Sequence, residues 1–124
     1  MNLVVTVPKW FWQEWLYEGD VAGDPYTGEE WGFFLGGNKP PIGQGDRLYI
    51  VAYGRLRGYA PVTRLGFQDG KWVICRRGNA VAVTLSDESG LYKEVRGFQG
   101  FRKVWWQSEN EIPFPDWKTE NTPL

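Results

Sequence analysis

Short apolar segments separated by turn residues fill the chain after Asp46, and this pattern restricts the fold more than any other feature. Residues 47–53 and 56–65 are rich in Leu, Ile, Val and Tyr, and Gly54 separates them. Asp69-Gly70 is a second strong turn signal. Apolar segments of this length joined by such turns are typical of β-hairpins. The sequence therefore predicts a mostly antiparallel sheet.

Three further strands are expected, at residues 72–76, 80–85 and 101–106. A turn at 77–79 joins the first two of them into a hairpin. Pro61 lacks a backbone N–H, which places its strand at an edge of the sheet or at a bulge. Beyond residue 108 the prolines predict an extended tail, and Trp117 is expected to anchor this tail on the sheet.

The first part of the chain follows a different pattern. Residues 3–7 form a short β-rich apolar run. Residues 9–18 contain no helix breaker and have aromatic residues at helical spacing, which predicts one short amphipathic helix. Segment 19–30 holds three Gly, one Pro and four acidic residues, which predicts a mobile acidic loop. The aromatic segment 31–35 is expected to be an extended strand.

These elements predict an α+β fold in a single domain of residues 1–124, with residues 108–124 as its extended tail. A chain of this length buries roughly two-thirds of its unfolded surface, so it can fold without disulfides. We expect a small, mostly antiparallel β-barrel with the N-terminal helix packed over its open end. An open sheet with the helix on one face is the alternative architecture.

The composition excludes several kinds of chemistry. The chain has no His, so it offers no imidazole base and no His ligand for a metal. Its single Cys, Cys75, rules out an internal disulfide and a zinc site of several thiolates, and we expect it to be buried. Paired carboxylates such as Glu109 and Glu111 are interpreted as solvated loop residues. We assign no catalytic residue, no metal and no cofactor.

Charge is distributed unevenly along the chain, although the formal net charge is only -1. Between residues 39 and 103 there are twelve basic and five acidic residues, which gives +7. The two ends together hold two basic and ten acidic residues, which gives -8. A basic middle segment is compatible with a nucleic-acid partner, even though the pI of the whole chain is about 5.5.

One stretch resembles a known family. Residues 42–51 read Ile-Gly-Gln-Gly-Asp-Arg-Leu-Tyr-Ile-Val, and residues 57–62 read Arg-Gly-Tyr-Ala-Pro-Val. After an N-terminal strand, a helix and an aromatic strand, this resembles the PUA-like superfamily, which includes the ASCH and EVE domains. There a Gly-Asp pair, here Gly45-Asp46, opens a barrel strand. The Gly-x-Lys-x-x-Glu stretch of many ASCH domains is missing from residues 7–18, so their enzymatic roles are not implied.

The resemblance implies a barrel that binds nucleic acid, either RNA or DNA with a modified base, in a cleft between barrel and helix. Alternating Tyr and Arg residues in segment 53–59 fit such a surface, because residues two apart on a strand share a face. Arg supplies planar donors to phosphate, and an aromatic ring offers a face for a stacked base. The predicted nucleic-acid-binding residues are Trp10, Trp31, Tyr53, Arg55, Arg57, Tyr59, Arg76, Arg77 and Arg102.

Each of these features also has a purely structural interpretation. The tyrosines would cap the core, and the arginines would be solvated or would pair with the acidic loop. Trp12 and Trp15 are expected in the core. Of Trp105 and Trp106, one is expected in the core and the other exposed or covered by the tail. Asp46 is interpreted as a turn residue whose carboxylate accepts backbone N–H groups.

The sequence thus predicts a non-enzymatic nucleic-acid-binding module that reads a modified or flipped base in an aromatic-lined cleft. One alternative is a protein-interaction module that opposes a host or competitor factor through the acidic ends and the Pro-Phe-Pro segment 113–115. The other is a small carboxylate-dependent hydrolase or nuclease. Because no leader pattern and no run of about 18 apolar residues is present, we expect a cytoplasmic protein without a membrane partner.

Overall fold

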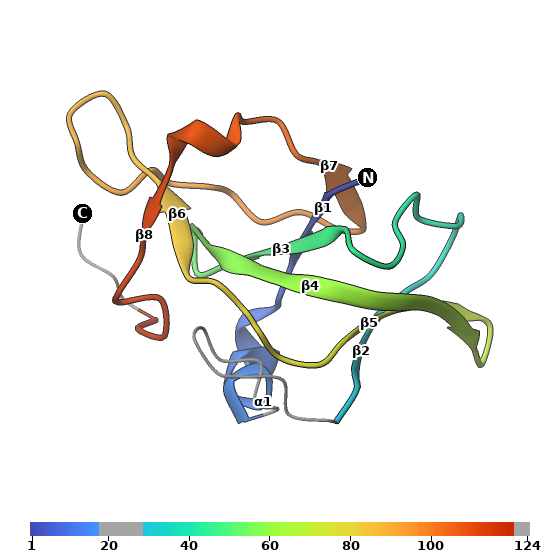
Figure 1. Ribbon diagram of the computed structural model, residues 1–124. Coiled ribbons are helices and arrows are strands. Elements are labelled where there is room, and N and C mark those ends of the chain that lie inside the picture. Colours follow the sequence, from blue (N-terminus) through green and yellow to red (C-terminus); the bar gives the residue numbers. More distant parts are fainter. Residues whose placement is uncertain (18–28, 121–124) are drawn as a thin grey trace.

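The protein has an α+β fold, and the computed structural model describes residues 1–17 and 29–120 (Figure 1). The described strands are β1 (Leu3–Thr6), β2 (Trp31–Leu35), β3 (Arg47–Ala52), β4 (Arg55–Gln68), β5 (Lys71–Arg76), β6 (Val83–Leu85), β7 (Phe101–Lys103) and β8 (Glu111–Pro113). Six of them form one sheet in the order β2-β5-β4-β3-β1-β7, and β6 pairs with β8 in a second sheet. Strand β1 runs parallel to β3, and the other pairs are antiparallel.

The expected helix follows β1 directly. A 3-10 turn, η1 (Lys9–Phe11), continues into α1 (Trp12–Tyr17). Trp12 and Trp15 are fully buried, which confirms them as core residues. Within the described residues, no helix is long and apolar enough to cross a membrane. The acidic loop predicted at 19–30 lies outside the described residues, except for its last two.

Two of the three predicted hairpin turns are confirmed. Tyr53 and Gly54 join β3 to β4 with φ angles of 49° and 70°, and Asp69 and Gly70 join β4 to β5 with 52° and 77°. Two consecutive residues with positive φ form the turn whose twist matches paired antiparallel strands. The turn residues thus fix the order and register of three neighbouring strands.

The predicted hairpin between residues 72–76 and 80–85 is wrong. Strand β5 pairs with β4 and β2, whereas β6 pairs with β8 in the C-terminal tail. Gly78 and Asn79 both have positive φ and turn the chain away from β5, so that Val81 bridges to Tyr59 of β4 instead. The last strand of the main sheet is also shorter than expected, because β7 ends at Lys103.

Pro61 was expected at an edge of the sheet or at a bulge. The edge position is excluded, because β4 lies between β3 and β5, whereas a bulge does lie next to Pro61. The N–H of Val62 donates to the carbonyl of Asp46, on the β3 side of the strand. Backbone nitrogens point alternately to the two sides of a strand, so the nitrogen of Pro61 points to the β5 side. On that side, Pro61 lies between the Tyr59–Val81 bridge and the first residue pair of β4 with β5. Its missing N–H therefore removes no hydrogen bond between strands. A bulge follows, between Val62 and Arg64.

The described strands form an open sheet with edges β2 and β7, so no closed barrel is seen among them. The sheet is nevertheless curled, because both edges pack against one core. That core joins Leu3, Val5, Leu35, Ile42, Leu48, Val62 and Ile74, with Phe33 and Phe101 packed on it. The C-terminal tail closes a second core, in which Phe114 and Trp117 pack with Trp12. This confirms that Trp117 anchors the tail, and it leaves Phe114 of the Pro-Phe-Pro segment buried.

Candidate nucleic-acid interface

The face predicted for the Tyr and Arg residues of segment 53–59 does not exist, because a bulge interrupts the strand. Val51 of β3 pairs with Leu56 while Ile50 pairs with Gly58, which leaves Arg57 as the extra residue. Arg57 is only 2% exposed. Its guanidinium donates to backbone carbonyls that include those of Ala52 (2.8 Å), Trp117 (3.1 Å), Thr119 (2.7 Å) and Tyr53 (3.4 Å). Arg57 therefore holds the C-terminal tail to the sheet.

The ring of Tyr59 packs on residues of β3. It lies 5.1 Å from that of Tyr49, with the guanidinium carbon of Arg47 4.2 Å from its centroid. Tyr53, in the turn, donates its hydroxyl to the carbonyl of Lys9 at 3.5 Å. The structure therefore separates the two tyrosines instead of placing them on one stacking surface.

Two other predicted arginines are buried as well. Arg76 has no exposed surface, and its guanidinium carbon lies 3.6 Å from the ring centroid of Trp15. Arg55 is buried at the start of β4 and donates to the carbonyl of Gly54 at 2.8 Å. Trp31 is half-buried on β2, and its indole N–H has no hydrogen-bond acceptor in the described part of the chain. In this structure neither arginine offers its guanidinium to a phosphate at the surface.

A narrow pocket lies beneath α1, where the family resemblance places a cleft. It is lined by Trp12, Trp15, Arg57, Tyr59 and Trp117, among others, and its volume is about 10 Å³. A space of about 10–15 Å³ holds one water molecule. A base therefore does not fit in this pocket as the structure stands.

An open groove lies on the other side of η1, between the two edges of the sheet. We call it the aromatic groove; its main lining residues are Trp10, Phe11, Phe34, Phe98 and Gly100, and its volume is about 400 Å³. Trp10 is 82% exposed and Phe34 is 50% exposed. Large aromatic side chains with free faces are thus collected in one concavity, which is the property that stacking of bases requires.

Local sequence explains how the groove is formed. Phe33 and Phe34 are neighbours on β2, so they point to opposite faces. Phe33 packs on Trp15 with ring centroids 6.1 Å apart, which leaves Phe34 outside. On the opposite wall, the backbone N–H of Phe98 donates to the hydroxyl of Thr6 at 3.0 Å and fixes the loop before β7.

The loop and strand on that wall are basic. Segment 93–103 contains four basic residues and one acidic residue, Glu94. Arg102 is exposed, and its guanidinium carbon lies 4.4 Å from the ring centroid of Phe98. Lys103 and Arg96 are exposed too. Of the nine predicted residues, only Trp10 is among those that line the groove, and Arg102 borders it through its contact with Phe98. The groove adds Phe34 and Phe98, which the sequence analysis missed.

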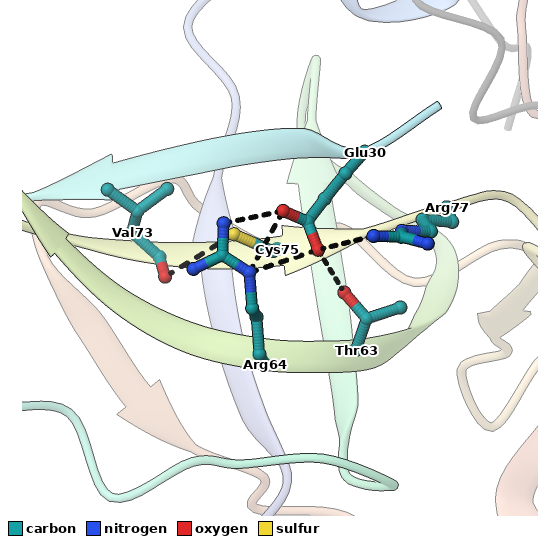
Figure 2. A network of polar contacts seen from close by, with 6 residues as sticks. All are labelled: Glu30, Thr63, Arg64, Val73, Cys75 and Arg77. Carbon is teal, nitrogen blue, oxygen red and sulfur yellow. Dashed lines mark hydrogen bonds and ion pairs between the residues drawn. The ribbon is translucent and has the colours of Figure 1, made fainter. Parts of the chain in front are cut away.

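Arg77 belongs to a separate polar network, drawn in Figure 2. It pairs with Glu30 at 3.5 Å, and Arg64 pairs with the same carboxylate at 2.6 Å. The hydrogen bond from Arg64 is the main cause that lowers the pKa of Glu30 below its ordinary value. Glu30 is the end of the predicted acidic loop. The structural interpretation paired the arginines of segment 53–59 with this loop, whereas in the structure Arg64 and Arg77 pair with its last residue.

Several other predictions can be compared with the structure. Asp46 accepts the N–H of Gly43 at 2.9 Å, which confirms it as a turn residue, and it also binds the N-terminal amine at 2.6 Å. Cys75 is buried as expected, and burial raises its pKa. Trp105 is exposed, whereas Trp106 is half-buried and donates to Glu111 at 2.9 Å.

Glu111 is not a solvated loop residue, because Tyr49 also donates to its carboxylate, at 2.6 Å. Burial and this bond raise the pKa of Tyr49 to about 12. Within residues 1–17 and 29–120, no three Cys, Asp or Glu side chains are grouped so that they could hold a metal ion. No protein family, curated protein or solved structure matches this chain.

Proposed function

We propose that the protein is a non-enzymatic nucleic-acid-binding module that holds a single-stranded segment in the aromatic groove. One observation carries the proposal: the exposed rings of Trp10 and Phe34 and the half-buried ring of Phe98 line one concavity beside a basic wall. Stacking of a base on an aromatic side chain contributes about 1–3 kcal/mol and tolerates any base. Arg102 and Lys103 supply the positive charge that follows a phosphate backbone.

The finer proposal is that the module reads a modified or flipped base of RNA or DNA. Its support is the PUA-like resemblance of residues 42–62 together with the aromatic lining of the groove. We further propose that the curled sheet is a PUA-like barrel that stays open between β2 and β7, because residues of both edge strands pack against the same core. The opening between these edges is then the binding cleft.

Fluorescence anisotropy with labelled single-stranded RNA, plain DNA and modified DNA tests this function. Three phosphate contacts would give a slope of log affinity against log salt of roughly -2. Trp10→Ala is expected to weaken binding by about 5- to 150-fold, which is the loss of one stacked base. Because Trp10 is exposed, its removal should leave the fold intact.

Tyr17→Ala is the matched control, because Tyr17 is an exposed aromatic residue of α1 outside the groove. Its affinity should equal that of the wild type. The proposal fails if none of the three nucleic acids binds at low salt, or if the two variants lose the same affinity.

A further inference from the structure

The carboxylate of Glu30 lies in a ring of donors on one face of the main sheet (Figure 2). Arg64 of β4 approaches it with Nε at 3.0 Å and Nη2 at 2.6 Å. The hydroxyl of Thr63 donates to it at 3.1 Å, and Nη2 of Arg77 lies at 3.5 Å. Two arginines and one hydroxyl therefore converge on a single anion. We call Thr63, Arg64 and Arg77 the donor cradle.

The carboxylate fits this cradle unevenly. Its contact with Arg64 is as short as a charge-assisted hydrogen bond can be, whereas its contact with Arg77 is well beyond the usual 2.7–2.9 Å. A carboxylate has two oxygens in one plane, but a phosphate presents oxygens in several directions. A tetrahedral oxyanion therefore matches donors that come from three sides better than Glu30 does.

The cradle is also open to solvent. It borders a hollow of about 490 Å³ whose lining also includes Gln44 and Gly45. The side chain of Arg64 is 60% exposed. The side chain of Glu30 is only 17% exposed, so this carboxylate can leave the cradle only where a second anion takes over its hydrogen bonds.

We propose that the donor cradle is a binding site for a phosphate group and that Glu30 is its internal occupant. Phosphate enters from the hollow, the carboxylate of Glu30 moves away, and the fork of Arg64 then binds two phosphate oxygens. The shared chemistry is a phosphate ester, either a monoester or the diester of a backbone. The inference goes beyond the proposed function, because the cradle shares no residue with the aromatic groove.

Titration of inorganic phosphate into the protein in chloride buffer tests this site, with the arginine Nε–Hε resonances of Arg64 and Arg77 followed by NMR. Glu30→Gln keeps the shape of the side chain and removes its charge. It is expected to bind phosphate about tenfold more tightly than the wild type, because one like charge within hydrogen-bond distance is removed. Glu14→Gln makes the same change of net charge on α1 and should bind phosphate as the wild type does.

A double variant and the wild-type protein provide two further tests of the donor cradle. Thr63→Val in the Glu30→Gln background should lose several-fold in affinity, because one donor is removed while both arginines remain. In the wild type, phosphate should shift the same two resonances at a higher phosphate concentration, and this result tests the cradle without any variant. Methyl phosphate and dimethyl phosphate then separate a monoester ligand from a backbone diester.

The proposal is overturned if phosphate binds Glu30→Gln and Glu14→Gln equally, or if the resonances of Arg64 and Arg77 do not move. Neither result would affect the aromatic groove, whose test uses Trp10 and a nucleic acid. Loss of binding in the groove would likewise leave phosphate binding in the cradle unchanged.

Discussion

The Trp12→Ala variant is expected to lose about 3–5 kcal/mol of its free energy of unfolding, as large aromatic residues do in a packed core. Trp12 has no exposed surface. Its ring packs 6.0 Å from that of Trp117, and its indole N–H donates to the carbonyl of Lys118 at 3.3 Å. Without this side chain, α1 loses its main contact with the C-terminal tail.

Urea unfolding followed by circular dichroism measures this loss. Tyr17→Ala on the same helix is the control, because Tyr17 is 85% exposed, and its effect should stay within about 0.5 kcal/mol. A Trp12→Ala variant with less than about 1 kcal/mol of destabilisation would show that the tail does not depend on this contact.

The Gly58→Ala variant is expected to lose about 3 kcal/mol or more, because a strained φ angle and a backbone clash act together. Gly58 has φ +146°, a region that L-residues rarely adopt, and an added Cβ would collide with the carbonyl oxygen of Val81. The neighbouring Tyr59 and Val81 exchange two hydrogen bonds of 3.0 and 2.8 Å. The chain segment before β6 must therefore move away, and it takes those two bonds with it.

The same unfolding measurement applies, with Gly36→Ala as the control. An added Cβ at Gly36 meets no atom within 4 Å, and the backbone there has no positive φ. Its stability should stay within about 0.5 kcal/mol of the wild type. Equal stabilities of the two glycine variants would contradict the close approach of β4 and Val81.

Local signals in the sequence predicted the elements that local interactions build. The turns at 53–54 and 69–70 need positive φ at two successive residues. Gly54, Asp69 and Gly70 adopt it at little cost, whereas Tyr53 adopts it although a bulky side chain disfavours it. Pro8 followed by aromatic residues at helical spacing predicted α1. These features depend only on neighbours in the chain, so a single sequence is enough to find them.

Pairing between distant segments was not predictable in the same way. Strand β8, within the predicted tail, pairs with β6 about 28 residues earlier, and nothing in its three residues specifies that partner. Closure of the sheet likewise depends on how β2 and β7 approach each other. The sequence pattern allowed both an open sheet and a barrel, and the described strands form the open one.

The candidate site was predicted in part, for a physical reason. Side chains alternate between the two faces of a regular strand, so Arg57 was predicted on the same face as Tyr59. The extra residue at the bulge breaks this alternation. Arg57 and Arg76 are buried against aromatic rings, so part of the positive charge of the middle segment is structural. Phe34 could have been found, because a strand with Phe33 and Phe34 side by side must leave one ring outside.

Ultraviolet cross-linking of the wild type to a single-stranded oligonucleotide, read by mass spectrometry, tests the aromatic groove most directly. The cross-linked residues should be Trp10, Phe34 and Phe98. Phe67 and Trp72 near the end of the β4–β5 hairpin, at the right of Figure 1, form another partly exposed aromatic pair. Cross-links at that pair, with none in the groove, would contradict the proposed site.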